Sequence, residues 1–231
     1  MAALQLHIEY VSNYPISENT YVLRCEGSSA CVLVDPFSFD ELQSRSMLDG
    51  LSPEYILLTH EHYDHIGAVN ELKRAYPNCK VVCSRNCDTC IVDSRKNMSA
   101  FFGFQLAVNE RYDIPDGYIE SVKPYECESA DIGFCGDMLL RWSGHEFNLF
   151  ETPGHSKGSI CIVLDGTILF SGDTILKEDP ICTKLPTGSR RDYWEKTVPL
   201  LMEMDLDTQV YPGHGDSFFL RDKYVNGEWQ C

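Results

Sequence analysis

Three of the seven histidines in this 231-residue chain fall within six consecutive positions, together with one aspartate. They belong to the run T-H-E-H-Y-D-H-I-G at Thr59–Gly67, and they are His60, His62, Asp64 and His65. Imidazole and carboxylate groups together form ligand sets that suit Zn, Fe, Mn and Co. Whatever fold the chain adopts must therefore present four potential metal ligands from one short stretch of backbone.

The apolar segment that leads into this run, Tyr55–Thr59, predicts a strand. Side chains two positions apart in an extended segment point the same way, so His60 and His62 can reach a single metal ion. Asp64 and His65 follow as the chain turns into a predicted helix, and they face another direction. We therefore expect these two residues to hold a second ion next to the first.

Three later segments each place one potential ligand beside a glycine, after a predicted strand. E-T-P-G-H-S-K-G-S presents His155, L-F-S-G-D-T-I-L presents Asp173, and V-Y-P-G-H-G-D-S presents His214. A lone histidine is usually structural, and an aspartate after glycine is usually a turn residue. Glycine also lets the backbone approach a bound group closely, so together with the crowded run these residues indicate one shared metal site. The remaining histidines, His7 and His145, have no such context, and we interpret them as structural.

Short apolar runs bounded by Gly, Pro, Asp and Ser predict two series of strands. They are Leu4–Tyr10, Thr20–Cys25, Ala30–Val34, Tyr55–Thr59 and Lys80–Ser84, then Met138–Trp142, Phe147–Glu151, Ser159–Leu164, Thr167–Ser171 and Thr208–Tyr211. Apolar residues spaced by three and four predict helices at Ile66–Tyr76 and Arg190–Met204, the second kinked by Pro199. The pattern predicts an α/β fold with mixed sheets. Residues 85–136 are the least regular, and we expect an insertion or lid there within one domain of residues 1–231.

The chain is acidic, with 35 Asp and Glu against 19 Lys and Arg and a net charge of −16. This balance repels polyanions, so we expect neither nucleic acid nor an anionic membrane as a partner. The first residues lack a basic segment followed by an apolar one, and no stretch reaches the roughly 18 apolar residues of a spanning helix. We therefore expect a cytoplasmic protein.

Eleven cysteines are present, an odd number that argues against complete disulfide pairing. Without an export signal, reduced thiols are expected. Four of them are closely spaced, at Cys79, Cys83, Cys87 and Cys90. A structural zinc site would favour two close pairs joined by a longer link, so we interpret these four as small buried thiols and keep a structural or redox site as the alternative.

The ligand-bearing runs occur in the order found in the metallo-β-lactamase-fold hydrolases, which this chain resembles over about residues 4 to 216. V-L-V-D-P, with Asp35, is similar to the first motif of that family. The chain looks most like the short, glyoxalase II-like (hydroxyacylglutathione hydrolase-like) subgroup, because K-N-M-S-A-F-F-G at Lys96–Gly103 is similar to a segment often seen there. The resemblance implies a four-layer αββα sandwich, in which two mixed β-sheets are flanked by helices and the site lies at one edge of both sheets.

The resemblance also implies two divalent metal ions, with Zn as the first expectation and Fe or Mn as alternatives. The expected ligands are His60, His62 and His155 for one ion, Asp64, His65 and His214 for the other, and Asp173 as a bridge between them. Asp35 is expected behind the ligands, where it would orient them. Asp64 is also the expected catalytic residue, because it could orient a metal-bridging hydroxide and shuttle its proton during attack on a substrate carbonyl.

A small thioester or related acyl compound is the expected substrate. Glyoxalase II enzymes carry a C-terminal helical domain that helps hold glutathione, whereas this chain ends soon after His214, so the resemblance leaves open whether glutathione is recognised. The alternatives on the same fold are a sulfur dioxygenase with a single iron, a lactone or phosphodiester hydrolase, and a binding module without activity. Lys184, Arg190 and Arg191 supply local positive charge, either for a substrate carboxylate or phosphate or as a solvated helix start.

Overall fold

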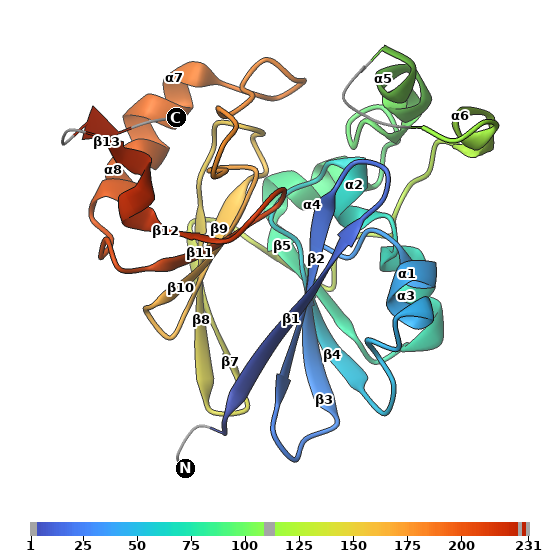
Figure 1. Cartoon of the computed structure of the whole chain (residues 1–231), viewed down its shortest axis with the longest axis horizontal. Coiled ribbons are helices and arrows are strands. Elements are labelled where there is room, and N and C mark those ends of the chain that lie inside the picture. The colour runs from blue at the N-terminus through green and yellow to red at the C-terminus, as the bar shows by residue number, and fades with distance from the viewer. Residues whose placement is uncertain (1–3, 109–113, 226–227, 230–231) are drawn as a thin grey trace.

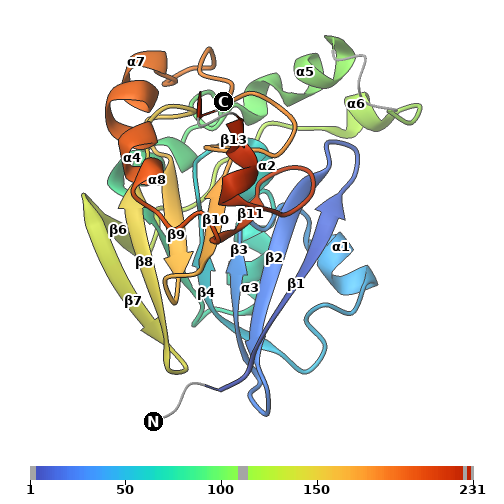
Figure 2. The same ribbon diagram turned by 60° about the vertical axis from the view of Figure 1, so that its left-hand side comes forward.

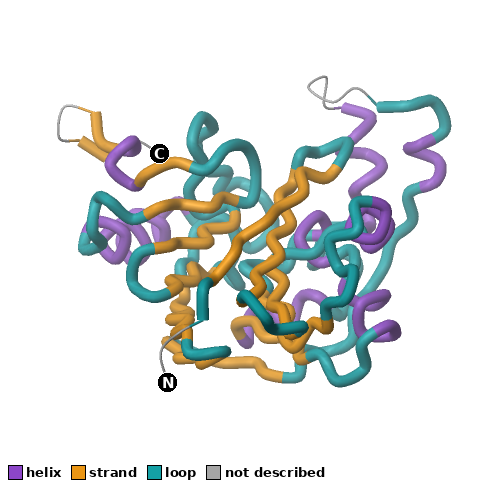
Figure 3. The backbone as a smooth tube through the Cα atoms, turned by 60° about the horizontal axis from the view of Figure 1, so that its bottom comes forward, coloured by secondary structure: helices purple, strands orange, loops and turns teal. Residues whose placement is uncertain are grey.

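The computed structural model describes residues 4–108, 114–225 and 228–229, and within these residues the chain forms two six-stranded sheets and one small hairpin. The sheets pack face to face, and helices cover their outer faces (Figures 1 and 3). Both sheets are mixed. In the first, antiparallel pairs join β1, β2 and β3, and parallel pairs join β3 to β6. In the second, β10 and β11 are parallel and the other pairs antiparallel.

The order of strands across the first sheet is β1 (Leu6–Asn13), β2 (Glu18–Cys25), β3 (Ala30–Val34), β4 (Ser52–Leu57), β5 (Lys80–Ser84) and β6 (Ile132–Phe134). Across the second it is β12 (Phe218–Phe219), β11 (Gln209–Pro212), β10 (Ile168–Gly172), β9 (Ile160–Leu164), β8 (His145–Glu151) and β7 (Asp137–Trp142). The hairpin is β13 (Tyr224–Val225) with β14 (Glu228–Trp229).

The α-helices are short. They are α1 (Phe39–Ser44), α2 (Tyr63–Ile66), α3 (Val69–Ala75), α4 (Arg85–Ile91), α5 (Phe102–Val108), α6 (Tyr118–Ser121), α7 (Arg190–Asp192) and α8 (Val198–Met202). Two 3-10 turns lie at Ser99–Phe101 and Leu220–Lys223, and a π-helical turn at Tyr193–Thr197 joins α7 to α8. In the part of the chain that the structure describes, every helix is too short or too polar to cross a bilayer.

The core has three apolar layers, which makes the molecule the four-layer αββα sandwich that the sequence predicts. The middle layer lies between the sheets and includes Tyr21, Leu23, Leu57, Phe147 and Phe170. A second layer packs the first sheet against Leu42 of α1, Leu72 of α3 and Ile91 of α4, and a third packs the second sheet against Leu201 of α8. Burying one such large side chain contributes roughly 1.5–3 kcal/mol. Strands covered on both faces read as continuous apolar runs, which is why the sequence shows them.

Several predicted boundaries are wrong by a few residues. β1 ends at Asn13, three residues beyond the predicted end, and β2 begins at Glu18. The strand ends carry polar residues, so the apolar pattern in the sequence stops before them. Asn13 and Glu18 are nevertheless buried, and Asn13 Nδ2 donates to Glu18 Oε2 at 2.7 Å. β4 runs from Ser52 to Leu57 and therefore ends before the metal-binding run rather than at Thr59.

The predicted helix Ile66–Tyr76 is two helices, α2 and α3, separated at Gly67 and Ala68. Here the chain turns against a neighbouring loop: the Ala68 N–H donates to the Pro36 carbonyl at 2.9 Å, and a Cβ on Gly67 would lie 2.4 Å from the Phe37 oxygen. The predicted helix Arg190–Met204 is divided into α7, the π-helical turn Tyr193–Thr197 and α8, and Pro199 lies in the first turn of α8.

Residues 85–136, predicted as an insertion or lid, begin and end inside the sandwich. α4 packs on the first sheet, and β6 pairs with β5 at the edge of that sheet. Between them, α5 and α6 lie beyond the end of the first sheet and outside both sheet layers (Figures 1 and 2). Residues 109–113 of this segment lie outside the described residues. The expectation of a lid is therefore confined to the segment around α5 and α6.

Candidate metal centre

The predicted ligands come from loops at one edge of the sandwich, where the carboxyl ends of several strands meet. The first sheet supplies Asp35 after β3 and the run His60–His65 after β4. The second sheet supplies His155 after β8, Asp173 after β10 and His214 after β11. Carboxyl ends of strands are the usual place for ligands in α/β sheets. The two halves of the chain therefore face each other across this edge.

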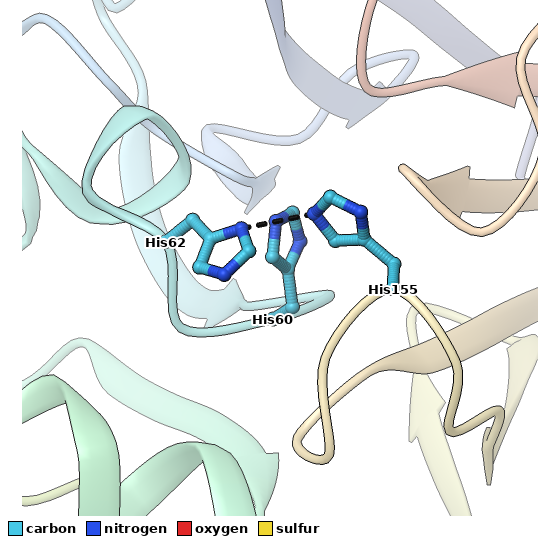
Figure 4. A group of neighbouring side chains, drawn as sticks. All are labelled: His60, His62 and His155. Atoms are coloured by element: carbon cyan, nitrogen blue, oxygen red, sulfur yellow. Dashed lines mark hydrogen bonds between the residues drawn. The ribbon is translucent and has the colours of Figure 1, made fainter. Parts of the chain in front are cut away.

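Three histidines form the first group, and Figure 4 shows their rings converging from two loops. One ring nitrogen from each of His60, His62 and His155 lies within 4.8 Å of the others. His62 Nδ1 and His155 Nε2 are 2.9 Å apart, and all three residues are buried. The ring centroids of His60 and His62 lie 4.7 Å apart, so both rings reach the same place, as predicted.

The second group consists of Asp64, His65 and His214, whose nearest ligand atoms also lie within 4.8 Å of one another. His214 Nε2 is 3.4 Å and His65 Nε2 is 3.9 Å from Asp64 Oδ2. A further grouping contains Asp35 with His60 and His65. The carboxylate of Asp35 is already engaged by protein groups, so we assign it to the support of the site.

Asp173 lies between the two groups. Its Oδ2 is 3.5 Å from His155 Nε2 and 3.6 Å from His214 Nε2, and its Oδ1 is 3.5 Å from His65 Nε2. A Cβ on Gly213 would lie 2.3 Å from Asp173 Oδ1, so only glycine allows this close approach. Asp173 thus lies near His155 of the first group and near His65 and His214 of the second, as a bridging ligand would.

The second ring nitrogen of four histidines is held by the protein, which orients the first nitrogen towards the site. The partners are Thr59 Oγ1 for His60, Asp35 Oδ2 for His65, the Cys182 carbonyl for His155 and the Ile16 carbonyl for His214, at 2.9–3.1 Å. Sequence reasoning missed Cys182 and Ile16, because a backbone carbonyl leaves no side-chain signature. Thr59 could have been found, since it adjoins the run.

Buried polar atoms without hydrogen-bond partners collect at this centre. Among the described residues they include His60 Nε2, His65 Nε2 and Asp173 Oδ1, which are the atoms that face the site. Buried polar groups are nearly always satisfied in folded proteins. Cations bound at the two ligand groups would satisfy these atoms, so the His and Asp cluster fits a metal site.

The protonation states of the first histidine group and of Asp173 suit a cation. Burial lowers the pKa of His62 to about 3, and burial with neighbouring histidines lowers the pKa of His60 and His155, so these rings are neutral at pH 7. Burial alone would raise the pKa of Asp173, but the surrounding histidines, His214 first, hold it below the usual value. Neutral imidazoles and ionised carboxylates are the forms that bind metal. His65 and His214 differ, because burial would lower their pKa but the nearby carboxylates of Asp64 and Asp173 raise it. A cation would therefore have to displace a proton from each of these two rings.

Comparison with known proteins identifies the family. The sequence profile of the metallo-beta-lactamase superfamily matches residues 13–214. The chain belongs to this superfamily. Its members bind divalent metals and act as hydrolases, which agrees with the His and Asp cluster.

Relatives within the superfamily include enzymes and proteins of similar length. The chain is 30% identical to an uncharacterized protein of Mycobacterium leprae, over 86% of this chain and 87% of that protein. It is 27% identical to a hydroxyacylglutathione hydrolase of Enterobacter sp. (strain 638), over 78% of this chain but only 56% of the enzyme. One similar solved structure is BLEG-1 B3 metallo-beta-lactamase, with a TM-score of 0.75 and 25% identity over 94% of this chain and 96% of that protein. Another is TTHA1623 in a di-iron-bound form, with a TM-score of 0.69 and 25% identity over 93% of this chain and 96% of that protein.

The superfamily's first motif places Asp35 behind the ligands, as predicted. Asp35 Oδ1 accepts from the Thr59 N–H at 2.7 Å, and Asp35 Oδ2 accepts from Thr59 Oγ1 at 2.5 Å and contacts His65 Nδ1 at 3.0 Å. One buried carboxylate therefore fixes both the start of the run and the His65 ring.

We expect Asp35→Asn to weaken metal binding by about 10–100-fold, as loss of an outer partner of a metal ligand usually does. The asparagine side chain has the same size as that of aspartate, but one of its two carboxylate oxygens becomes an NH₂ group. This donor would face His65 or Thr59, where Asp35 presents an acceptor. Asn tolerates the left-handed backbone of Asp35 (φ 50°), so the fold should persist. Chelator competition measures the zinc affinity, and an unfolding curve measures the stability of the fold. An unchanged zinc affinity would contradict the supporting role of Asp35.

The other singled-out residues lie outside the centre. His145 contacts Asp165 Oδ2 through Nδ1 at 2.6 Å and the Leu4 carbonyl through Nε2 at 3.0 Å, a structural role as predicted. The described cysteines are free thiols, and Cys79, Cys83, Cys87 and Cys90 are buried. In the described chain, none of the four joins a group of three or more potential ligands.

A cavity of about 690 Å³ opens onto the centre. Its lining residues are Pro15, Ile16, Ser17, Asp64, His155, Asp173, Leu176, Asp179, Pro180, Cys182, Leu185, His214 and Gly215. The predicted anion-binding residues Lys184, Arg190 and Arg191 are not among these described lining residues, and Arg191 pairs with Glu195 at 2.8 Å. The cavity is large enough for a small molecule.

Proposed function

We propose that the protein is a dinuclear metal-dependent hydrolase that acts on a thioester or related acyl compound. The observation that carries this proposal is the pair of ligand groups joined by Asp173. His60, His62 and His155 would hold one ion, and Asp64, His65 and His214 the other. Zn suits this set of nitrogen and oxygen ligands best, and Fe or Mn remain compatible with it. The di-iron form of TTHA1623 supports two metal positions.

Two ions, when bound, supply a nucleophile at neutral pH by lowering the pKa of a shared water, and they polarise the substrate carbonyl. The protein residues provide the geometry for this chemistry. Asp64 belongs to the cavity wall, and its Oδ2 lies 3.4 Å from His214 Nε2, so this carboxylate would be placed to orient the attacking water and accept its proton. The partners of the histidines hold their rings in place while the charge changes.

The cavity favours an acyl group with an apolar chain. Ile16, Leu176, Pro180 and Leu185 contribute apolar side chains to its wall, and Asp179 contributes a carboxylate. No Lys or Arg belongs to its described lining, so the carboxylates of glutathione find no cation there. We therefore propose a small thioester with a neutral, partly apolar acyl group. The net charge of −16 supports a small-molecule partner rather than nucleic acid.

A substrate screen on the purified protein tests the proposal. We expect hydrolysis of short neutral acyl thioesters, with slower reaction of their carboxylate-bearing analogues, because the described lining of the cavity contains the Asp179 carboxylate and no Lys or Arg to pair with an anion. The panel should also contain lactones, phosphodiesters and a persulfide with an oxygen electrode. Oxygen uptake with a single bound iron would replace the proposal by sulfur dioxygenase chemistry, and preference for a lactone or phosphodiester would replace the substrate class.

A further inference from the structure

Glu61 lies between two predicted ligands, and its side chain points away from them into the protein. Neighbouring side chains of an extended segment alternate in direction, so Glu61 faces opposite to His60 and His62. The residue is fully buried. A carboxylate in such a place is stable only with hydrogen-bond donors around it, and the donors of Glu61 come from distant parts of the chain.

Two hydroxyl groups donate to the Glu61 carboxylate, one to each oxygen. Ser156 Oγ donates to Oε2 at 2.8 Å, and Thr187 Oγ1 donates to Oε1 at 3.1 Å. Ser156 directly follows His155, which is the member of the first ligand group that comes from the second sheet. Thr187 belongs to the segment 182–188, which contains the carbonyl that holds the His155 ring and the Leu185 side chain of the cavity wall. One side chain of the first half thus holds two loops of the second.

The local backbone is adapted to these contacts. A Cβ on Gly158 would lie 2.3 Å from Glu61 Oε2, so the loop after His155 approaches the carboxylate as closely as glycine permits. Thr187 has a φ of 69°, a left-handed conformation that is unusual for a β-branched residue. Such strain persists only where surrounding contacts fix it. Here the Lys157 N–H donates to Thr187 Oγ1 at 3.2 Å while that hydroxyl donates to Glu61.

We propose that Glu61 is a positioning residue that sets the place of His155 relative to His60 and His62 and ties segment 182–188 to the metal centre. The inference rests on the metal site of the proposed function. It adds that the residue between the two histidines of the run determines the geometry of the first ligand group, although it binds no metal itself. The three contacts of the His155 loop, at Ser156, Gly158 and the Cys182 carbonyl, then act as one unit.

The first test replaces Glu61 by leucine, which is similar in size and has no acceptor. Ser156 Oγ keeps a contact with Ser159 Oγ at 3.0 Å, and Thr187 Oγ1 keeps the Lys157 N–H, so the variant removes the link without leaving either hydroxyl alone. Zinc titration against a chromophoric chelator gives the affinity of each ion. We expect one of the two affinities to fall by about 10–100-fold, with the other nearly unchanged.

Asp88→Leu is the matched control, because Asp88 is a buried carboxylate whose partners, Arg85 and the Ala130 N–H, lie outside the centre. It should lower the unfolding temperature while both zinc affinities stay within about threefold of the original protein. Affinities that are unchanged in Glu61→Leu, or lowered equally in Asp88→Leu, would overturn the positioning role. An original protein that binds no zinc or iron would instead overturn the proposed function, and this inference with it.

A second pair of variants decides the matter if Glu61→Leu does not fold. Thr187→Ala removes the hydroxyl on the surface side of the link, and Thr187→Ser restores it. We expect Thr187→Ala to lower the same single affinity by about 10-fold and Thr187→Ser to recover most of it. Equal affinities in the two variants would show that the hydroxyl does not position His155, and would overturn the proposal.

Discussion

Asp173→Ala should remove bound metal and abolish hydrolysis while the sandwich stays folded. The carboxylate is within 3.6 Å of His155, His214 and His65, so its loss withdraws a ligand from both proposed ions at once. Loss of an outer partner already costs about 10–100-fold in affinity, and we expect a larger loss here. Elemental analysis should find fewer than one ion per chain after dialysis.

Asp165→Ala is the control for this variant. It also breaks an aspartate–histidine contact, with His145, but at a place outside the centre. We expect it to retain the metal content and activity of the original protein and to lose only stability. Two ions per chain in Asp173→Ala would refute its bridging role, whereas unfolding of that variant would show up directly in its circular dichroism.

Stripping the protein with a chelator should eliminate thioester hydrolysis. Bound ions would hold the pKa of the attacking water at about 7, and without them it would return to the far higher pKa of bulk water. The described site residues Asp64 and Asp173 cannot replace this activation, because a carboxylate alone is a weak base for water. We expect activity to fall by at least about 10³-fold, as measured by thiol release at pH 7.

Returning zinc, iron or manganese to the stripped protein, one metal at a time, provides the control. Recovery that saturates near two equivalents would support the dinuclear centre and identify the metal. Full activity in protein verified to be free of metal would exclude this mechanism. In that case the acyl transfer would have to use another nucleophile of the cavity, of which Cys182 is the one with a thiol.

The strands inside the sandwich could be predicted from the sequence because both of their faces are buried. Ile56, Leu57 and Leu58 precede the metal-binding run as an apolar series, and all three are fully buried. Helix α1 was missed although Ser38 caps it by accepting from the Glu41 N–H at 3.2 Å, a spacing that the sequence shows. β6 has only three residues, with Gly133 in the middle, and its pairing with β5 depends on a contact distant in sequence.

The candidate ligands could be named from the sequence because imidazole and carboxylate side chains are chemically distinctive. The structure brings all seven together, and metal binding by them stays a prediction. Apart from Asp35, the sequence did not reveal which groups hold them. Glu61 resembles any surface glutamate until its partners, Ser156 and Thr187, are seen beside it. The Ile16 and Cys182 carbonyls are invisible to any reasoning from residue type. Contacts between distant segments, rather than local propensity, define this supporting set.

Because the centre is assembled from loops of both sheets, metal binding there would depend on the folded state of the whole molecule. Residues His60, His62, Asp64 and His65 belong to one half, and the other three ligands to the second half. An ion shared in this way dissociates when either half opens, so binding resists the separation of the halves. At a free metal concentration 100 times the dissociation constant, this linkage adds about 2.7 kcal/mol to the free energy of unfolding. Metal supply would thereby govern the lifetime of the protein as well as its chemistry.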